Sequence, residues 1–175
     1  MVNRQRVLVA FSSRSGSTAG TAEEITGVLR AHGLVVDCRS KDEIEDLAPY
    51  RAVILGSGMF VASRASDGGG FIERHAAALR GIDLWLFCSG PIGRRAAAPG
   101  EEIPVEAVAR VIGARGVATF GAVAAGDGTD AVASPIPADR RQVRAWAAEI
   151  AAELETAPAP ARAGRDRCQR LAATR

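Results

Sequence analysis

Short apolar runs alternate with longer amphipathic stretches along most of this chain. Five runs have the length and apolar content of strands buried on both faces, at residues 6–11, 34–38, 51–56, 84–88 and 117–123. Four stretches carry apolar residues at helical spacing and predict helices over residues 18–32, 71–80, 105–112 and 138–155. A polar segment at residues 41–47 is compatible with one further short helix, and a glycine-rich loop is expected up to Gly70.

This alternation predicts one α/β domain. Parallel strands joined by right-handed helical crossovers leave only a few topologies, and five strands favour the order 2-1-3-4-5. We therefore expect a three-layer, doubly wound, five-stranded parallel sheet over residues 1–155. Residues 156–175 are rich in Pro, Ala and Arg without apolar periodicity, which predicts a disordered tail.

Charge and cysteine content narrow the setting. The chain of 175 residues has a net charge of +2, but the five arginines and one aspartate after residue 155 give the tail +4 and leave the body at −2. The body therefore shows no nucleic-acid face. No apolar stretch reaches the roughly 18–20 residues of a transmembrane segment, and no signal peptide is visible at the start. Three widely spaced cysteines without a CxxC motif favour a reducing, cytoplasmic location.

The turn between the first strand and the first helix is rich in hydroxyl groups. It reads Ser12-Ser13-Arg14-Ser15-Gly16-Ser17-Thr18 and contains no acid. Hydroxyl groups, a glycine that permits close approach and the free N–H groups of a helix start all suit a phosphate. A helix cap is the alternative, but a cap needs one Ser or Thr rather than five. The lysine of a Walker loop and the glycines of a dinucleotide-binding loop are both missing.

The same turn resembles the signature of the flavodoxin-like family. The signature places an aromatic residue, a hydroxyl, a small residue, a threonine, an alanine and an aliphatic residue at fixed spacing. Here these positions hold Phe11, Ser13, Gly16, Thr18, Ala22 and Ile25. The resemblance covers roughly residues 5–155 and implies that residues 12–18 hold the phosphate of FMN.

Two further loops enter through this resemblance. It implies that the flavin ring lies between a loop beginning Ser57-Gly58-Met59-Phe60 and a loop beginning Ser89-Gly90-Pro91. Phe60 is the only aromatic residue in either loop, so it is the candidate to stack on the ring, with inward packing as the alternative. Tyr50 precedes the third strand and is expected at the opposite end of the sheet.

A narrower resemblance suggests a reaction. Residues 11–16, 71–79 and 143–147 are similar to segments of menaquinone-dependent protoporphyrinogen oxidases and their actinobacterial flavodoxin-domain relatives. It implies an FMN-dependent oxidoreductase that passes electrons from a reduced donor to a redox partner or quinone-type acceptor, with protoporphyrinogen IX as the specific candidate substrate. Peripheral membrane contact is compatible with a quinone, and the sequence does not determine the oligomeric state.

Two other function classes share this fold. A flavodoxin-type electron carrier without its own substrate predicts a strongly acidic docking face, which a body charge of −2 fits poorly. A phospho-acceptor signalling domain needs acids where Ser12, Ser13 and Ser57 stand, so it is excluded.

The remaining reactive residues have structural interpretations. We expect His75 to be a surface or packing residue and Cys88 to be a buried structural thiol near the predicted ring site. No paired carboxylates, nucleophile–base pair or metal-ligand spacing stands out, as expected where a cofactor carries the redox chemistry.

Overall fold

The computed structural model describes residues 6–12, 17–57, 69–89, 105–120 and 137–156. Five parallel strands form one sheet in the order β2-β1-β3-β4-β5, which confirms the predicted topology. The strands are β1 (Arg6–Ser12), β2 (Val36–Ser40), β3 (Tyr50–Ser57), β4 (Asp83–Ser89) and β5 (Gly116–Phe120).

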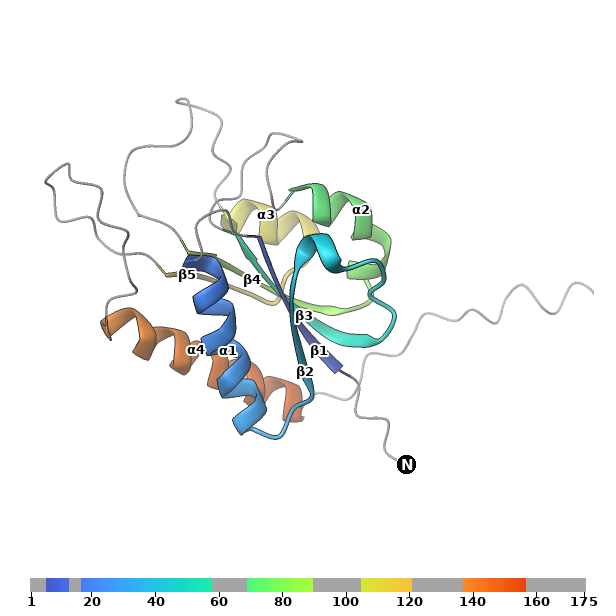
Figure 1. Ribbon diagram of the computed structural model, residues 1–175. Coiled ribbons are helices and arrows are strands. Elements are labelled where there is room, and N and C mark those ends of the chain that lie inside the picture. Colours follow the sequence, from blue (N-terminus) through green and yellow to red (C-terminus); the bar gives the residue numbers. More distant parts are fainter. Residues whose placement is uncertain (1–5, 13–16, 58–68, 90–104, 121–136, 157–175) are drawn as a thin grey trace, which may run out of the picture.

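Helices cover both faces of this sheet (Figure 1). α1 (Ser17–Ala31) and α4 (Pro137–Thr156) lie side by side on one face, and α2 (Gly69–Leu79) and α3 (Val105–Ile112) lie on the other. A short 3₁₀ helix, η1 (Lys41–Glu43), follows β2. No helix in these described segments is long and apolar enough to cross a membrane.

The three central strands, β1, β3 and β4, are buried on both faces, as their nearly continuous apolar sequences predict. In β1, Val7 and Val9 pack into the core beneath α1 and α4, whereas Leu8 and Ala10 pack into the core beneath α2 and α3. All four side chains are fully buried. Successive strand residues point to opposite faces, so each of these three strands contributes side chains to both cores.

The second strand begins later than the sequence pattern predicts. Gly33 has φ 78°, and the Leu34 amide donates to the Leu29 carbonyl, which completes a left-handed helix end after α1. Leu34 is therefore used to close the helix, and β2 starts at Val36 rather than at residue 34. Gly113 (φ 72°) ends α3 in the same way, with the Ala114 amide on the Ala109 carbonyl.

The other strand and α-helix boundaries differ by at most two residues within the described segments. α2 begins at Gly69, so the glycines expected in a loop before Phe71 form its first turn instead. The α3 bounds agree with the prediction, and α4 extends one residue beyond it at each end. Residues 121–123 of the predicted fifth strand and the predicted tail lie outside the described residues, and the division at residue 155 stays a prediction.

Candidate functional site

Three of the predicted site residues are the last residues of adjacent strands. Ser12 ends β1, Ser57 ends β3 and Ser89 ends β4, with exposures of 4%, 1% and 5%. The sequence predicted these serines at the start of loops, but their backbones still pair with the neighbouring strands. In an open α/β sheet, ligands bind beyond the carboxyl ends of the strands, where the strand order reverses. That point lies between β1 and β3, so these serines border it.

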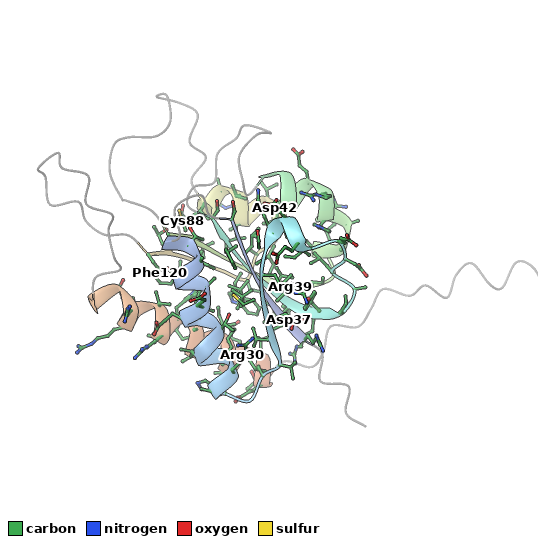
Figure 2. All side chains as sticks on the ribbon, in the orientation of Figure 1. Arg30, Asp37, Arg39, Asp42, Cys88 and Phe120 are labelled. Carbon is green, nitrogen blue, oxygen red and sulfur yellow. The ribbon has the colours of Figure 1, made fainter. Side chains whose placement is uncertain are left out.

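The strand-end side chains divide between the two faces. Ser12 is in register with Ser57, and Ser57 with Cys88, so these three form one row of small polar side chains. By alternation from Leu86, this row faces α2 and α3. Ser89 has the opposite parity and faces α1. Figure 2 shows Cys88 and Phe120 close to this carboxyl edge.

A buried hydroxyl pair connects the first helix to the fourth strand. The Ser89 Oγ and the Thr18 Oγ1 are hydrogen-bonded at 2.7 Å across 71 residues of sequence. Thr18 is the second residue of α1 and is 1% exposed. The bond therefore joins the predicted phosphate turn to the strand from which the second predicted ring loop departs. Both residues were predicted as site residues, but nothing in the sequence indicated that they touch.

The start of α1 suits an anion. Its first turn contains no acidic residue, and the first N–H groups of a helix lack intrahelical acceptors. The aligned peptide dipoles give this end of the helix a partial positive charge. The buried Thr18 hydroxyl adds a side-chain donor at the same place. These described groups fit a phosphate.

Three aromatic rings pack against one another near the carboxyl edge of the sheet. The ring of Phe87 lies 6.3 Å from that of Phe120 and 6.4 Å from that of Trp146, and the last two are 5.6 Å apart. Phe87 also lies over Gly56, where an added Cβ would overlap the Phe87 ring. Trp146 lies in α4 and is half-buried. Nothing in the sequence indicated that the three rings meet.

Cys88 lies near this edge and is half-buried rather than buried as the sequence predicted, whereas His75 lies in α2. Burial raises the pKa of the Cys88 thiol, and the Glu106 carboxylate raises it further, so the thiol stays protonated at neutral pH. His75 is 8% exposed and packs against Phe71 with ring centroids 4.6 Å apart and the rings tilted by 48°. Burial lowers its pKa, which keeps the ring neutral. His75 is therefore a packing residue, as the sequence predicted.

The rest of the predicted set lies outside the described residues. These positions are Ser13, Arg14, Ser15, Gly16, Gly58, Met59, Phe60, Gly90 and Pro91. Ser17 is the first residue of α1. The roles of all these residues, and of the described ones, stay predictions. A surface groove between α1 and α4, lined by residues such as Gly27 and Val143, contains none of the predicted set.

Comparison with known families decides the classification. Residues 8–112, more than half of the chain, match the flavodoxin domain family. The chain belongs to this family. The match begins in β1 and ends at the last residue of α3, so it includes the strand ends and the helix start described above. A sequence search among curated proteins gives no significant match.

Solved flavodoxin structures share this fold. A flavodoxin from the domain Archaea is 18% identical, with 86% of this chain and 99% of that chain covered and a TM-score of 0.61. A flavodoxin of Streptococcus pneumoniae TIGR4 is 18% identical, with 85% and 99% covered and a TM-score of 0.58. Rubredoxin oxygen:oxidoreductase of Desulfovibrio gigas is 18% identical, with 86% of this chain but 36% of that chain covered and a TM-score of 0.62. At these identities the likeness establishes the fold.

Membership of the flavodoxin domain family implies FMN as the cofactor. The described residues fit its phosphate end, because an acid-free helix start and the buried Thr18 hydroxyl meet beside the ends of β1 and β4. The narrower resemblance to protoporphyrinogen oxidases is not part of what the family match establishes.

Proposed function

We propose that this flavodoxin-domain protein binds FMN at the carboxyl edge of its sheet and acts as an oxidoreductase. Electrons would pass from a reduced donor to an acceptor such as a quinone. The observation that carries the proposal is the buried Thr18–Ser89 pair at the start of α1. The pair supplies hydroxyl groups at the place where a flavodoxin-domain protein needs hydrogen-bond donors to the phosphate.

The roles of the chain's residues follow from their positions. The α1 N–H groups and Thr18 would hold the phosphate, together with residues 12–17 of the preceding turn. Ser57 and Ser89 end the strands that lead into the two predicted ring loops, residues 57–60 and 89–91. When bound, FMN supplies the redox chemistry, and the protein binds it, orients it and limits its contact with water.

Protoporphyrinogen IX oxidation is the specific reaction that we propose to test. Its support is the similarity of residues 11–16, 71–79 and 143–147 to quinone-dependent enzymes of that class. In the structure, residues 11–12 end β1, residues 71–79 lie in α2 on one face of the sheet, and residues 143–147 lie in α4 on the other face. Residues 13–16 lie outside the described residues. Oxidation of protoporphyrinogen IX to protoporphyrin IX removes six electrons and six protons. Each quinone takes up two of each to become a quinol, so three quinones are reduced.

A flavodoxin-type carrier is the alternative function. Carriers dock charged partners through complementary fields, and the −2 body charge of this chain offers only a weak one. Anaerobic kinetics separate the two functions. Turnover of a quinone by the purified protein with a reduced donor supports the enzyme. Electron delivery only to a second redox protein, with no quinone turnover, supports the carrier.

The cofactor proposal has a direct test. The purified protein should carry, or take up, a yellow chromophore whose released mass is that of FMN. Replacing Thr18 and Ser13 together by Glu should abolish FMN binding, because two carboxylates would repel the phosphate. The Thr26→Val variant is the control, since its hydroxyl bonds the Ala22 carbonyl inside α1. Unchanged FMN affinity in a folded Ser13→Glu/Thr18→Glu protein would contradict the proposed site.

A further inference from the structure

We infer that Ser89 is a positioning residue which turns the Thr18 hydroxyl into a hydrogen-bond donor for the phosphate, so that this pair sets the preference for phosphorylated flavin. The inference rests on the proposed function. It assigns to Ser89 a role different from the one expected from the sequence, where Ser89 was placed beside the flavin ring.

The chemistry of the pair is constrained by the number of protons. Each hydroxyl has one proton to donate and two lone pairs to accept. The two oxygens are 2.7 Å apart and buried, so one hydroxyl donates to the other. If Thr18 donated to Ser89, its oxygen would present only a lone pair to an approaching anion. If Ser89 donates, the Thr18 proton stays available.

A bound phosphate monoester favours one of these two arrangements. Its terminal oxygens carry close to two negative charges at neutral pH and act as acceptors. The arrangement with Ser89 as donor is therefore the one that an anion stabilises. Accepting a bond from Ser89 also polarises the Thr18 hydroxyl and strengthens the bond that it donates in turn. Ser89 thus acts on the phosphate through Thr18 without touching it.

The position of Ser89 supports this role over ring contact. Its parity in β4 is that of Trp85 and Phe87, whose side chains lie in the core beneath α1 and α4. Ser57 and Cys88 have the opposite parity and face α2 and α3. The first turn of α1, toward which Ser89 points, contains no acid that would compete with an anion for the Thr18 proton.

The test compares three ligands on the full chain. FMN, riboflavin and inorganic phosphate probe the whole cofactor, the cofactor without its phosphate and the phosphate alone. Ser89→Ala should weaken FMN binding roughly 3- to 10-fold, the range of one neutral hydrogen bond. It should leave riboflavin binding within about twofold and reduce the thermal shift given by phosphate. Flavin affinity is read from fluorescence quenching and phosphate binding from the melting temperature.

Two variants separate this role from a merely structural one. Ser89→Thr keeps the donor and should bind FMN within about twofold of the wild type, even if Ser89→Ala is too unstable to measure. In a Thr18→Val background, Ser89→Ala should cost no further FMN affinity, because no hydroxyl is left to orient. Thr26→Val removes another buried hydroxyl bond from α1 and should change neither flavin affinity.

The possible failures are distinguishable. A wild-type protein that binds neither FMN nor phosphate would overturn the proposed function itself. A wild-type protein that binds FMN, with Ser89→Ala weakening FMN and riboflavin equally or weakening neither, would overturn only the positioning role. Additive losses in the Thr18→Val/Ser89→Ala double variant would also overturn it.

Discussion

The side of the sheet where the strands begin, the amino edge, and the side where they end, the carboxyl edge, carry different kinds of polar group. At the amino edge, charged side chains pair with each other: Arg6 lies 3.0 Å from Asp37, and Arg115 lies 2.8 Å from Asp83. The Tyr50 hydroxyl donates to Asp37 over 3.1 Å, and burial together with that carboxylate raises the Tyr50 pKa. Figure 2 shows Asp37 on β2, well away from Cys88.

At the carboxyl edge, β1, β3 and β4 end in small uncharged groups instead. Ser12, Ser57 and Ser89 end three strands, and Thr18 lies beside them. Charges at the amino edge are neutralised by partners within the chain. Hydroxyl groups at the carboxyl edge can bind an anion, and they leave no buried, unpaired charge when the anion is absent. The difference suggests that the amino edge serves stability and the carboxyl edge serves binding.

The largest expected effect concerns two strand glycines, one toward each edge. A Cβ at Gly56 would overlap the Phe87 ring, whereas a Cβ at Gly116 would lie 2.9 Å from the Trp85 Cδ1. Gly56→Ala should therefore lower the free energy of unfolding by about 3 kcal/mol and Gly116→Ala by about 1 kcal/mol, as for overpacked cores. Urea unfolding measures both.

The control for this pair is Gly27→Ala in α1. Gly27 is exposed and has no atom within 4 Å of an added Cβ. This variant should gain roughly 0.5–1 kcal/mol, because alanine favours a helix over glycine. Equal losses at Gly56 and Gly116 would show that Phe87 is free to move aside.

The next effect should change binding more than stability. Thr18→Val keeps the side-chain shape but removes the hydroxyl, so FMN affinity should fall about 10- to 100-fold, the range of a bond to a charged group. Unfolding should become easier by about 1 kcal/mol, because Ser89 loses its buried partner. Fluorescence titration and urea unfolding give the two values. A loss of stability without loss of affinity would place the phosphate elsewhere.

The amino edge should show the reverse. Asp83→Asn removes the charge that pairs with Arg115, whose guanidinium also lies 5.9 Å from the Trp85 ring centroid. We expect a loss of about 1 kcal/mol in unfolding free energy, since the Arg115 side chain is 45% exposed and partly screened, and FMN affinity within twofold. Arg6→Gln, at a more exposed pair, should cost less than about 0.5 kcal/mol. Impaired FMN binding by Asp83→Asn would break the division between the edges.

These contrasts also show what could be predicted from the sequence. The strand order could be predicted because buried parallel strands are nearly continuous apolar runs. The α3 bounds could be predicted because its apolar residues recur at helical spacing. The start of β2 was missed by two residues, since the helix end at Gly33 uses Leu34. The turn composition identified Thr18 as a site residue, and the resemblance to the flavodoxin-like family identified Ser89. Their bond could not be predicted, because it depends on strand register and helix placement across 71 residues.

The smallest expected effect is a pH dependence on the α2 face. Burial lowers the pKa of His75, the Arg74 charge lowers it further, and the Ile44 backbone hydrogen bond and Asp46 raise it in part. The unfolded chain therefore binds a proton at higher pH than the folded one, so stability is complete above about 6.5, the ordinary histidine value, and falls as pH drops below it.

The variant that tests this is His75→Phe, which keeps a ring against Phe71 but cannot titrate. Between pH 7 and pH 5, its unfolding free energy should change less than that of the wild type. The two changes should differ by under about 1 kcal/mol. His32→Gln, at the exposed end of α1, is the matched control. An unchanged pH slope in His75→Phe would assign the dependence to other groups.

The position of the FMN phosphate tests the central claim most directly, and a crystal structure of the full chain with FMN would measure it. We predict a phosphate oxygen within hydrogen-bond distance of the Thr18 Oγ1, with the Thr18–Ser89 bond retained. A phosphate bound in the groove between α1 and α4, or a carboxyl edge filled by the chain's own side chains while flavin is bound elsewhere, would contradict it.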